Sequence, residues 1–149
     1  MLTFNQKMLI ILGLVVMGVL MLFLISNMEK SSQVSNEGQI QQTTIEWNTD
    51  FNSALTTAQK SNKLVFVDFY ADWCKYCQEL DEKTYPDPGV QQRLAQKYVT
   101  VKVNVDKNPD LATKYKIYGL PTLVIMDANG NEIKRVEGYQ TPSELISIL

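Results

Sequence analysis

The chain has 149 residues, 45% of them hydrophobic, and a formal net charge of −2. This length suits one modest globular domain plus a separate apolar segment, and the balanced charge gives no sign of nucleic-acid binding. Two cysteines without any histidine are too few for a zinc site within one chain, although a metal shared between two chains stays open. We therefore expect a protein without a metal or other cofactor.

An uncharged apolar run occupies residues 8–25, after a short tail at residues 1–7 that carries Lys7. As a helix this run would be about 27 Å long, close to the ~30 Å hydrocarbon thickness of a bilayer. We expect residues 8–26 to form an uncleaved transmembrane signal anchor in contact with membrane lipid. A cleaved signal peptide is the alternative, but the run is long and no small-residue cleavage site follows it. The positively charged tail is expected to stay in the cytoplasm.

Residues 27–43 are rich in Ser, Asn, Gln and Glu and show no helical spacing of apolar residues, so we expect a flexible linker. Residues 44–149 are expected to form the globular domain. Its apolar spacing and turn signals predict strands at 45–47, 64–70, 99–105, 122–127 and 131–137, and helices at 50–60, 74–83, 88–98, 109–115 and 142–149. This order predicts an α/β fold, with a central mixed sheet of four or five strands flanked by helices.

The two longest strand segments differ in their apolar pattern. Leu64–Tyr70 is apolar at nearly every position, which favours a central strand buried on both faces of the sheet. Val99–Val105 alternates strictly, so we expect its four valines on one buried face.

The chain's two cysteines, Cys74 and Cys77, follow the first of these strands in a C-x-x-C spacing. A thiol reacts as its thiolate, and a helix beginning at Cys74 would stabilise that thiolate with unpaired N–H groups and its positive dipole end. Cys77 lies nearly one turn later on the same face, so it can attack a mixed disulfide at Cys74 and release the substrate. This favours a redox-active pair. The alternatives are two core cysteines, half of a metal site, or a structural disulfide, which would restrain little chain entropy over so few residues.

Asp68 places a carboxyl group inside the apolar strand that leads to the cysteines. Burial there should raise the pKa of this group, so that it can accept and return the proton of Cys77 during disulfide exchange. The alternative is a carboxylate that only satisfies a buried hydrogen bond.

A family resemblance rests on these motifs. The stretch Leu64–Cys77, with Trp73 before the first cysteine and Asp68 six residues before it, resembles the active site of thioredoxin-fold proteins. The sequence Gly119-Leu120-Pro121-Thr122 is similar to the cis-proline loop of that family. The resemblance covers about Thr44 to Leu149. Within the family, the segments YADWCKYC and TYPDPGVQQRL are most similar to the C-terminal periplasmic domain of the transmembrane disulfide reductase DsbD.

The resemblance implies a substrate-binding loop beside the cysteines. Proline lowers the free-energy cost of a cis peptide bond, so a cis bond at Pro121 is expected. In the family this loop lies against the first cysteine and pairs with the substrate backbone like an added strand. Thr122 would make that contact, and Trp73 and Pro121 would line the same surface. The alternative is an ordinary turn before the strand at 122–127.

Three further residues are candidate modulators of the cysteines. Lys75 and Tyr76 lie between them, and the lysine cation can lower the pKa of Cys74. Asp81 lies one turn beyond Cys77, where the most similar relatives carry a glutamate. Because aspartate is one methylene shorter, a solvated helix charge is an equal alternative for Asp81.

Together these features predict a membrane-anchored thiol–disulfide oxidoreductase that chiefly reduces disulfides. Its partners would be disulfide-bonded periplasmic proteins, including partner redox proteins or apocytochrome c. No electron-conducting membrane domain is expected in this chain, so another membrane molecule would supply the electrons. The expected location is the bacterial inner membrane, crossed once, with the C-terminal domain in the periplasm.

Two alternatives to this function stay open. One is an oxidase that donates its disulfide to other proteins. Strong oxidants of this fold typically carry a histidine between the cysteines, which Lys75-Tyr76 lacks, and this favours reduction. The other is a binding module in which the cysteines are incidental.

Overall fold

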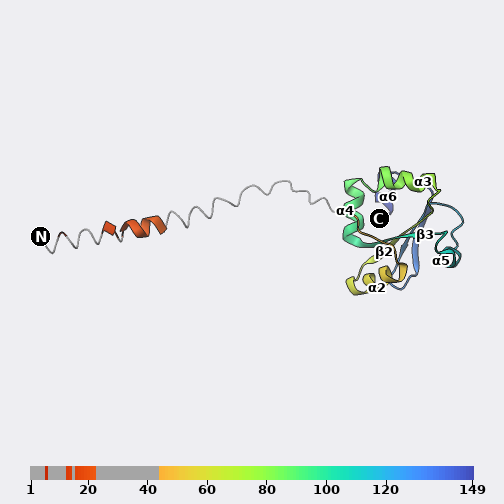
Figure 1. Cartoon of the computed structure of the whole chain (residues 1–149), viewed down its shortest axis with the longest axis horizontal. Helices are drawn as coiled ribbons and strands as arrows, with labels where there is room; N and C mark the ends of the chain where they lie inside the picture. The colour runs from red at the N-terminus through yellow and green to blue at the C-terminus, as the bar shows by residue number, and fades with distance from the viewer. Residues whose placement is uncertain (1–5, 7–12, 15, 23–43) are drawn as a thin grey trace. The chain divides into compact units, whose positions relative to one another are not determined.

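The computed structural model describes residues 6, 13–14, 16–22 and 44–149 (Figure 1). The chain divides into two units, residues 1–41 and 42–149. Residues 13–14 and 16–22 are helical and exposed. No helix among the described residues is both long enough and apolar enough to cross a membrane. The tail, the anchor at 8–26 and the linker at 27–43 lie wholly or largely outside the described residues, so they stay predictions.

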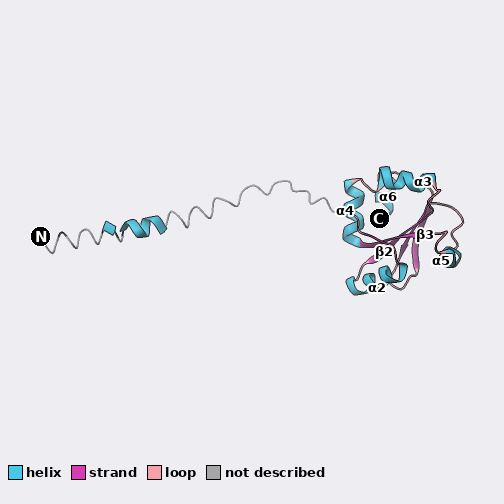
Figure 2. Ribbon diagram, viewed as in Figure 1, coloured by secondary structure: helices cyan, strands magenta, loops and turns pink. Residues whose placement is uncertain are grey.

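Residues 44–149 contain five strands and six helical segments (Figure 2). The strands are β1 (Trp47–Asn48), β2 (Leu64–Tyr70), β3 (Tyr98–Asn104), β4 (Thr122–Met126) and β5 (Glu132–Glu137). The α-helices are α2 (Phe51–Ser61), α3 (Lys75–Glu79), α4 (Pro88–Lys97), α5 (Pro109–Lys114) and α6 (Pro142–Ile148), and η2 (Leu80–Thr84) is a π-helical turn. The predicted mixed α/β architecture is confirmed.

The strands form one five-stranded sheet in the order β1-β3-β2-β4-β5. The pairs β1–β3 and β2–β3 are parallel, whereas β2–β4 and β4–β5 are antiparallel. The central strand is therefore β2, as its continuous apolar sequence predicted. This register sets Asp68 of β2 opposite Lys102 of β3 on one side and Leu123 of β4 on the other.

Helices cover both faces of the sheet. In Figure 1, α2 lies on one side of the strands, and α3, α4 and α6 lie on the other. Because successive strand residues point to opposite faces, β2 sends Val65, Val67 and Phe69 into the cluster that contains α2. Its alternate residue Phe66 joins the second cluster, which contains Leu80, Leu94 and Leu145. Asp68 shares the face of Phe66.

Two sequence predictions for this domain were wrong in detail. The third strand is Tyr98–Asn104 rather than Val99–Val105. Its valines do share one face as predicted, since Val99, Val101 and Val103 are buried in one cluster and Val105 packs against it. Thr100 and Asn104, on the opposite face, are buried as well, each 4% exposed. The reason is that β3 has a neighbouring strand on each side and helices over both faces, whereas Val105 lies beyond the strand and is only partly buried.

The helix predicted at 74–83 also changes character midway. It is α-helical over Lys75–Glu79 and then widens into η2, where the N–H of Tyr85 donates to the carbonyl of Leu80 at 2.9 Å. A π turn inserts one residue relative to an α-helix, which rotates the following side chains. As a result Tyr85, expected in a break, lies buried against the sheet.

Candidate active site

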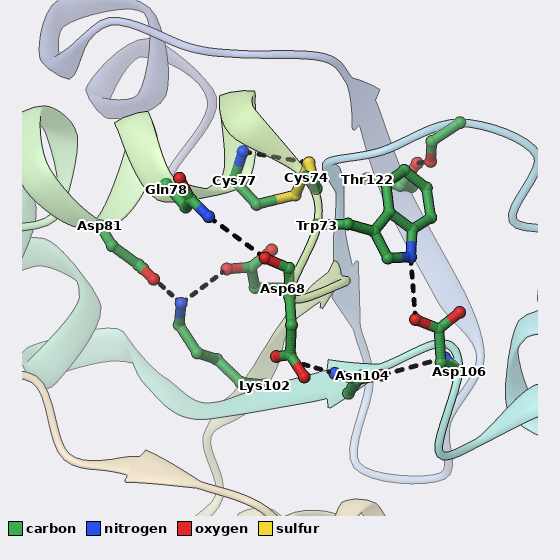
Figure 3. Close-up of a disulfide and its surroundings, with 12 residues drawn as sticks. Asp68, Trp73, Cys74, Cys77, Gln78, Asp81, Lys102, Asn104, Asp106 and Thr122 are labelled. Atoms are coloured by element: carbon green, nitrogen blue, oxygen red, sulfur yellow. Dashed lines mark hydrogen bonds and ion pairs between the residues drawn. A yellow bond between two sulfur atoms is a disulfide. The ribbon is translucent and has the colours of Figure 1, made fainter.

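The two cysteines form a disulfide at the start of α3, with their Cα atoms 5.3 Å apart (Figure 3). Cys74 is the N-cap residue, and its Sγ accepts a hydrogen bond from the Cys77 N–H at 3.1 Å. This confirms the predicted helix start at Cys74. Both are buried, Cys74 at 5% and Cys77 at 2% exposure. A thiolate at Cys74 would keep this N–H donor, which stabilises its charge.

The loop before β4 lies against the disulfide. The Leu120–Pro121 peptide bond is cis, as the resemblance implied. Leu120 is half-buried and packs against the cluster of Ala71, Cys74 and Cys77. The carbonyl of Pro121 accepts a hydrogen bond from Gly138 at 2.8 Å, which ties the loop to the end of β5.

Thr122 lies deeper than its expected role requires. It is fully buried, and its hydroxyl donates to the carbonyl of Gly119 at 2.8 Å. Its backbone belongs to β4, where it is paired with Phe69 on one side and Glu137 on the other. A substrate contact by Thr122 therefore stays a prediction. Leu120, which the sequence analysis did not single out, is the loop residue that packs on the disulfide, and its place before the cis proline was the available signal.

Exposed aromatic side chains lie in the two segments that supply the disulfide and the loop against it. Trp73 is 71% exposed, Tyr76 58% and Tyr118, two residues before Leu120, 89%. Within residues 44–149 only two other large hydrophobic side chains are exposed, Leu64 and Ile133. Concentrated exposed apolar surface is typical of a binding site. Lys75 is exposed as well.

Asn104 holds the exposed Trp73 in place indirectly. Its amide donates to the Asp72 carboxylate at 3.1 Å, while its side-chain oxygen accepts the N–H groups of Asp106 and Lys107. The Asp106 carboxylate, so positioned, accepts the indole N–H of Trp73 at 2.9 Å (Figure 3). From its local pattern Asn104 was predicted only as a strand residue, because this link joins segments that are far apart in the chain.

Asp68 is fully buried beside the positively charged Lys102, whose Nζ lies 3.4 Å from Oδ2. Burial raises the pKa of the Asp68 carboxyl to about 6, and the attraction of Lys102 opposes part of this rise. The predicted direction of the pKa shift is therefore confirmed. Neither carboxylate oxygen has a regular hydrogen-bond partner among the residues that the structure describes. A group with this pKa is mostly ionised at neutral pH and can accept a proton there.

Lys102 connects Asp68 to Asp81. Figure 3 shows its amine between the two carboxylates, and it forms an ion pair with each. The same amine lies 5.1–5.3 Å from the ring centroids of Trp47, Tyr70 and Tyr85. Asp81, a predicted modulator of the cysteines, thus contacts the cation that neutralises Asp68. Sequence reasoning missed Lys102, since only the strand register sets it opposite Asp68.

The site thus contains the groups that thiol–disulfide exchange uses. Cys74 lies at a helix start, Cys77 lies one turn later, and Asp68 projects from β2 toward the sheet face that α3 and η2 cover. Among the described residues no three His, Cys, Asp or Glu side chains are grouped as metal ligands.

Comparison with known proteins supports the same interpretation. A family model described as a thioredoxin-like domain matches residues 51–149. The thiol:disulfide interchange protein DsbD of Tatumella citrea is 41% identical over 106 residues, which cover 67% of this chain and 18% of that protein. Among solved structures, a thioredoxin from Thermus thermophilus has 29% identity and a TM-score of 0.64, covering 70% of this chain and 84% of its own. The oxidised C-terminal domain of Neisseria meningitidis DsbD has 25% identity and a TM-score of 0.58, covering 69% and 96%.

The chain spans about a fifth of the length of the curated DsbD relatives that it matches. The family match includes Asp68, both cysteines and Pro121. The resemblance drawn from the sequence, to thioredoxin-fold proteins and to the C-terminal domain of DsbD, is confirmed. The chain therefore belongs to the thioredoxin-like domain family, with a Cys74–Cys77 pair arranged as in a disulfide oxidoreductase.

Proposed function

We propose that this protein is a thiol–disulfide oxidoreductase that chiefly reduces disulfides in extracytoplasmic proteins. The observation that carries the proposal is the Cys74–Cys77 disulfide at the start of α3, with the cis-proline loop against it and Asp68 buried in the adjoining strand. Substrates are disulfide-bonded polypeptides, among them partner redox proteins or apocytochrome c.

The reaction has two exchange steps. The Cys74 thiolate attacks one sulfur of the substrate disulfide, which forms a mixed disulfide and releases the other substrate sulfur as a thiolate. Cys77 then gives its proton to Asp68 and attacks the Cys74 sulfur, which releases the second substrate sulfur and closes the Cys74–Cys77 disulfide. Two electrons pass from the protein to the substrate. A membrane electron donor must return the pair to the dithiol form.

Exposed side chains near the cysteines support a polypeptide substrate. Trp73, Tyr76 and Tyr118 offer aromatic surface for apolar side chains that flank a substrate cysteine. Leu120 lies beside the disulfide and has its backbone next to the cis bond, where a substrate strand can pair with it. Pro121 belongs to this loop, and Thr122, the first residue of β4, joins it to the sheet.

The direction of electron flow and the location rest on sequence features. Reduction is supported by the lack of histidine between the cysteines and by the similarity to DsbD, a thiol:disulfide interchange protein. Anchoring is supported by the uncharged apolar run at residues 8–25, which is long enough to cross a bilayer as a helix. The thioredoxin-like domain would then face the periplasm of a bacterium.

The reduction potential tests the direction of electron flow. The protein is equilibrated with glutathione buffers, and the dithiol fraction is measured by thiol trapping. A value of roughly −270 to −200 mV, as in thioredoxin and the glutaredoxins, supports a reductase. A value near roughly −120 mV marks an oxidant and would reverse the proposed direction.

A further inference from the structure

Tyr85 is a buried tyrosine with no assigned part in the exchange reaction. It follows the π turn η2 and is 4% exposed. Its ring packs edge-on against Trp47, with centroids 4.8 Å apart, and against Phe66 at 6.5 Å. These contacts hold the ring on the sheet face that Asp68 shares with Phe66.

The Tyr85 hydroxyl and the Asp68 carboxylate lie close together without regular hydrogen bonds. Both lie around the amine of Lys102, which is 3.4 Å from Oδ2 of Asp68 and 5.3 Å from the centroid of the Tyr85 ring. Consistent with this geometry, the hydroxyl lowers the pKa of the Asp68 carboxyl, and the carboxylate raises the pKa of Tyr85. Yet the hydroxyl and both carboxylate oxygens lack a regular partner among the described residues. A buried polar group without a hydrogen bond is costly and rare in native proteins. A donor and an acceptor that are both buried, adjacent and unpaired can satisfy each other.

The other groups that face Asp68 leave a hydrogen-bonding position on its carboxylate for Tyr85. Lys102 of β3 forms ion pairs with both Asp68 and Asp81, the latter in η2. The neighbour from β4 is the apolar Leu123. The nearby helix α3 carries Cys77, whose proton Asp68 would take under the proposed function. Tyr85 has its pKa well above the usual value of 10, so it keeps its proton and faces Asp68 as a neutral donor.

We propose that Tyr85 is a positioning residue: its hydroxyl donates a hydrogen bond to the ionised Asp68 carboxylate and holds it ready for the proton of Cys77. A carboxylate has room for both partners, since its two oxygens offer about four lone-pair sites. When Asp68 takes the proton, the same hydroxyl oxygen can accept a hydrogen bond from the new O–H group. The hydrogen bond is independent of the redox activity, whereas the positioning role rests on the proposed function.

The hydrogen bond is tested by titrating Asp68 in the oxidised full-length chain, solubilised in detergent, with carbon-13 NMR of the labelled carboxyl group. Tyr85→Phe removes one oxygen and should raise the Asp68 midpoint by about one pH unit, because a charge-stabilising hydrogen bond is lost. Tyr98→Phe is the matched control. That tyrosine is buried in the same cluster, but its hydroxyl contacts the Leu149 carbonyl at 3.3 Å, so no shift is expected. An unchanged or lowered midpoint in Tyr85→Phe overturns the proposal.

The positioning role is tested by the rate at which Cys77 resolves a mixed disulfide, measured across pH. In Tyr85→Phe the acid limb of this profile should move upward by the same amount as the Asp68 midpoint. A limb that stays in place while the midpoint moves overturns the positioning role. Asp68→Asn separates the two hypotheses: if it resolves the mixed disulfide at the wild-type rate, the proposed proton transfer to Asp68 fails, while the titration still decides the hydrogen bond.

Discussion

The residues around the disulfide fall into two sets with opposite surroundings. Asp68, Lys102 and Tyr85 are shielded from water, and their charges and protons depend on one another. Trp73 and Tyr118, by contrast, expose most of their aromatic surface. The difference supports the proposed division of roles, in which the buried set would govern proton transfer at Cys77 and the exposed set would contact the partner. Substitutions in the two sets should therefore change different kinetic parameters.

The largest effect is expected at the cysteines, which both sets serve. Cys74→Ser should reduce disulfide exchange to the uncatalysed background, because the attacking thiolate is lost. Cys77→Ser should instead accumulate mixed disulfides through Cys74, visible on non-reducing gels. If Cys74→Ser leaves the biological phenotype intact, the redox function is wrong and the binding-module alternative gains support.

Asp68→Asn tests the buried set. Loss of the proton acceptor should slow the resolving step at pH 7 by about 10²-fold. The deficit should shrink above pH 9, where the Cys77 thiol ionises unaided. Stopped-flow measurement of mixed-disulfide resolution gives these rates, and Asp110→Asn, an exposed carboxylate of α5, is the control. Rates equal to wild type between pH 6 and 9 would exclude the role of Asp68.

The same substitution should stabilise the fold at neutral pH. Asp68 has a pKa of about 6 when folded against 3.8 as an ordinary aspartate, so between these values the folded state binds the additional proton. The free energy of unfolding of the wild type therefore falls as pH rises through this window. Above pH 7 Asp68→Asn should be more stable by about 2 to 3 kcal/mol, with the gain gone below pH 4. Urea unfolding of the oxidised domain measures it, and a constant difference across this range would contradict the pKa of Asp68.

The smallest effect is expected in the exposed set. Tyr118→Ser should raise KM for a disulfide-bonded polypeptide by about 5- to 30-fold, the usual range for an aromatic contact residue. The turnover at saturation should stay unchanged, because the side chain contributes binding alone. Ile133→Ser is the control, since Ile133 is exposed on β5 near its end remote from the cis-proline loop. Equal KM values for the two variants would remove Tyr118 from the substrate surface.

Local patterns predicted the parts of the site that are set by neighbours in the chain. Apolar runs and turn signals gave the strands, and the C-x-x-C spacing gave the helix start at Cys74. The burial of Asp68 followed from its place inside an apolar strand. These inferences held because strand burial and helix capping depend on a few adjacent residues.

Residues whose roles depend on tertiary contacts escaped the sequence analysis. Lys102 is one polar residue of an alternating strand until the register sets it opposite Asp68. Tyr85 turns inward because η2 contains an additional residue per turn. Leu120 became important when the fold brought the cis bond to the disulfide. No local pattern contains such pairings, since each joins separate stretches of chain.

Asn104 has a consequence for what the protein can bind. One side chain ties Asp72, before the cysteines, to the backbone after β3, and Asp106 of that segment fixes the Trp73 indole. The surface around Trp73 is therefore ordered before a partner binds, so this surface loses little conformational entropy on association. The partner polypeptide must therefore adapt its conformation to this surface. Disulfides in extended or incompletely folded polypeptides, which can adjust to a rigid surface, should be reduced more readily than disulfides buried inside folded proteins.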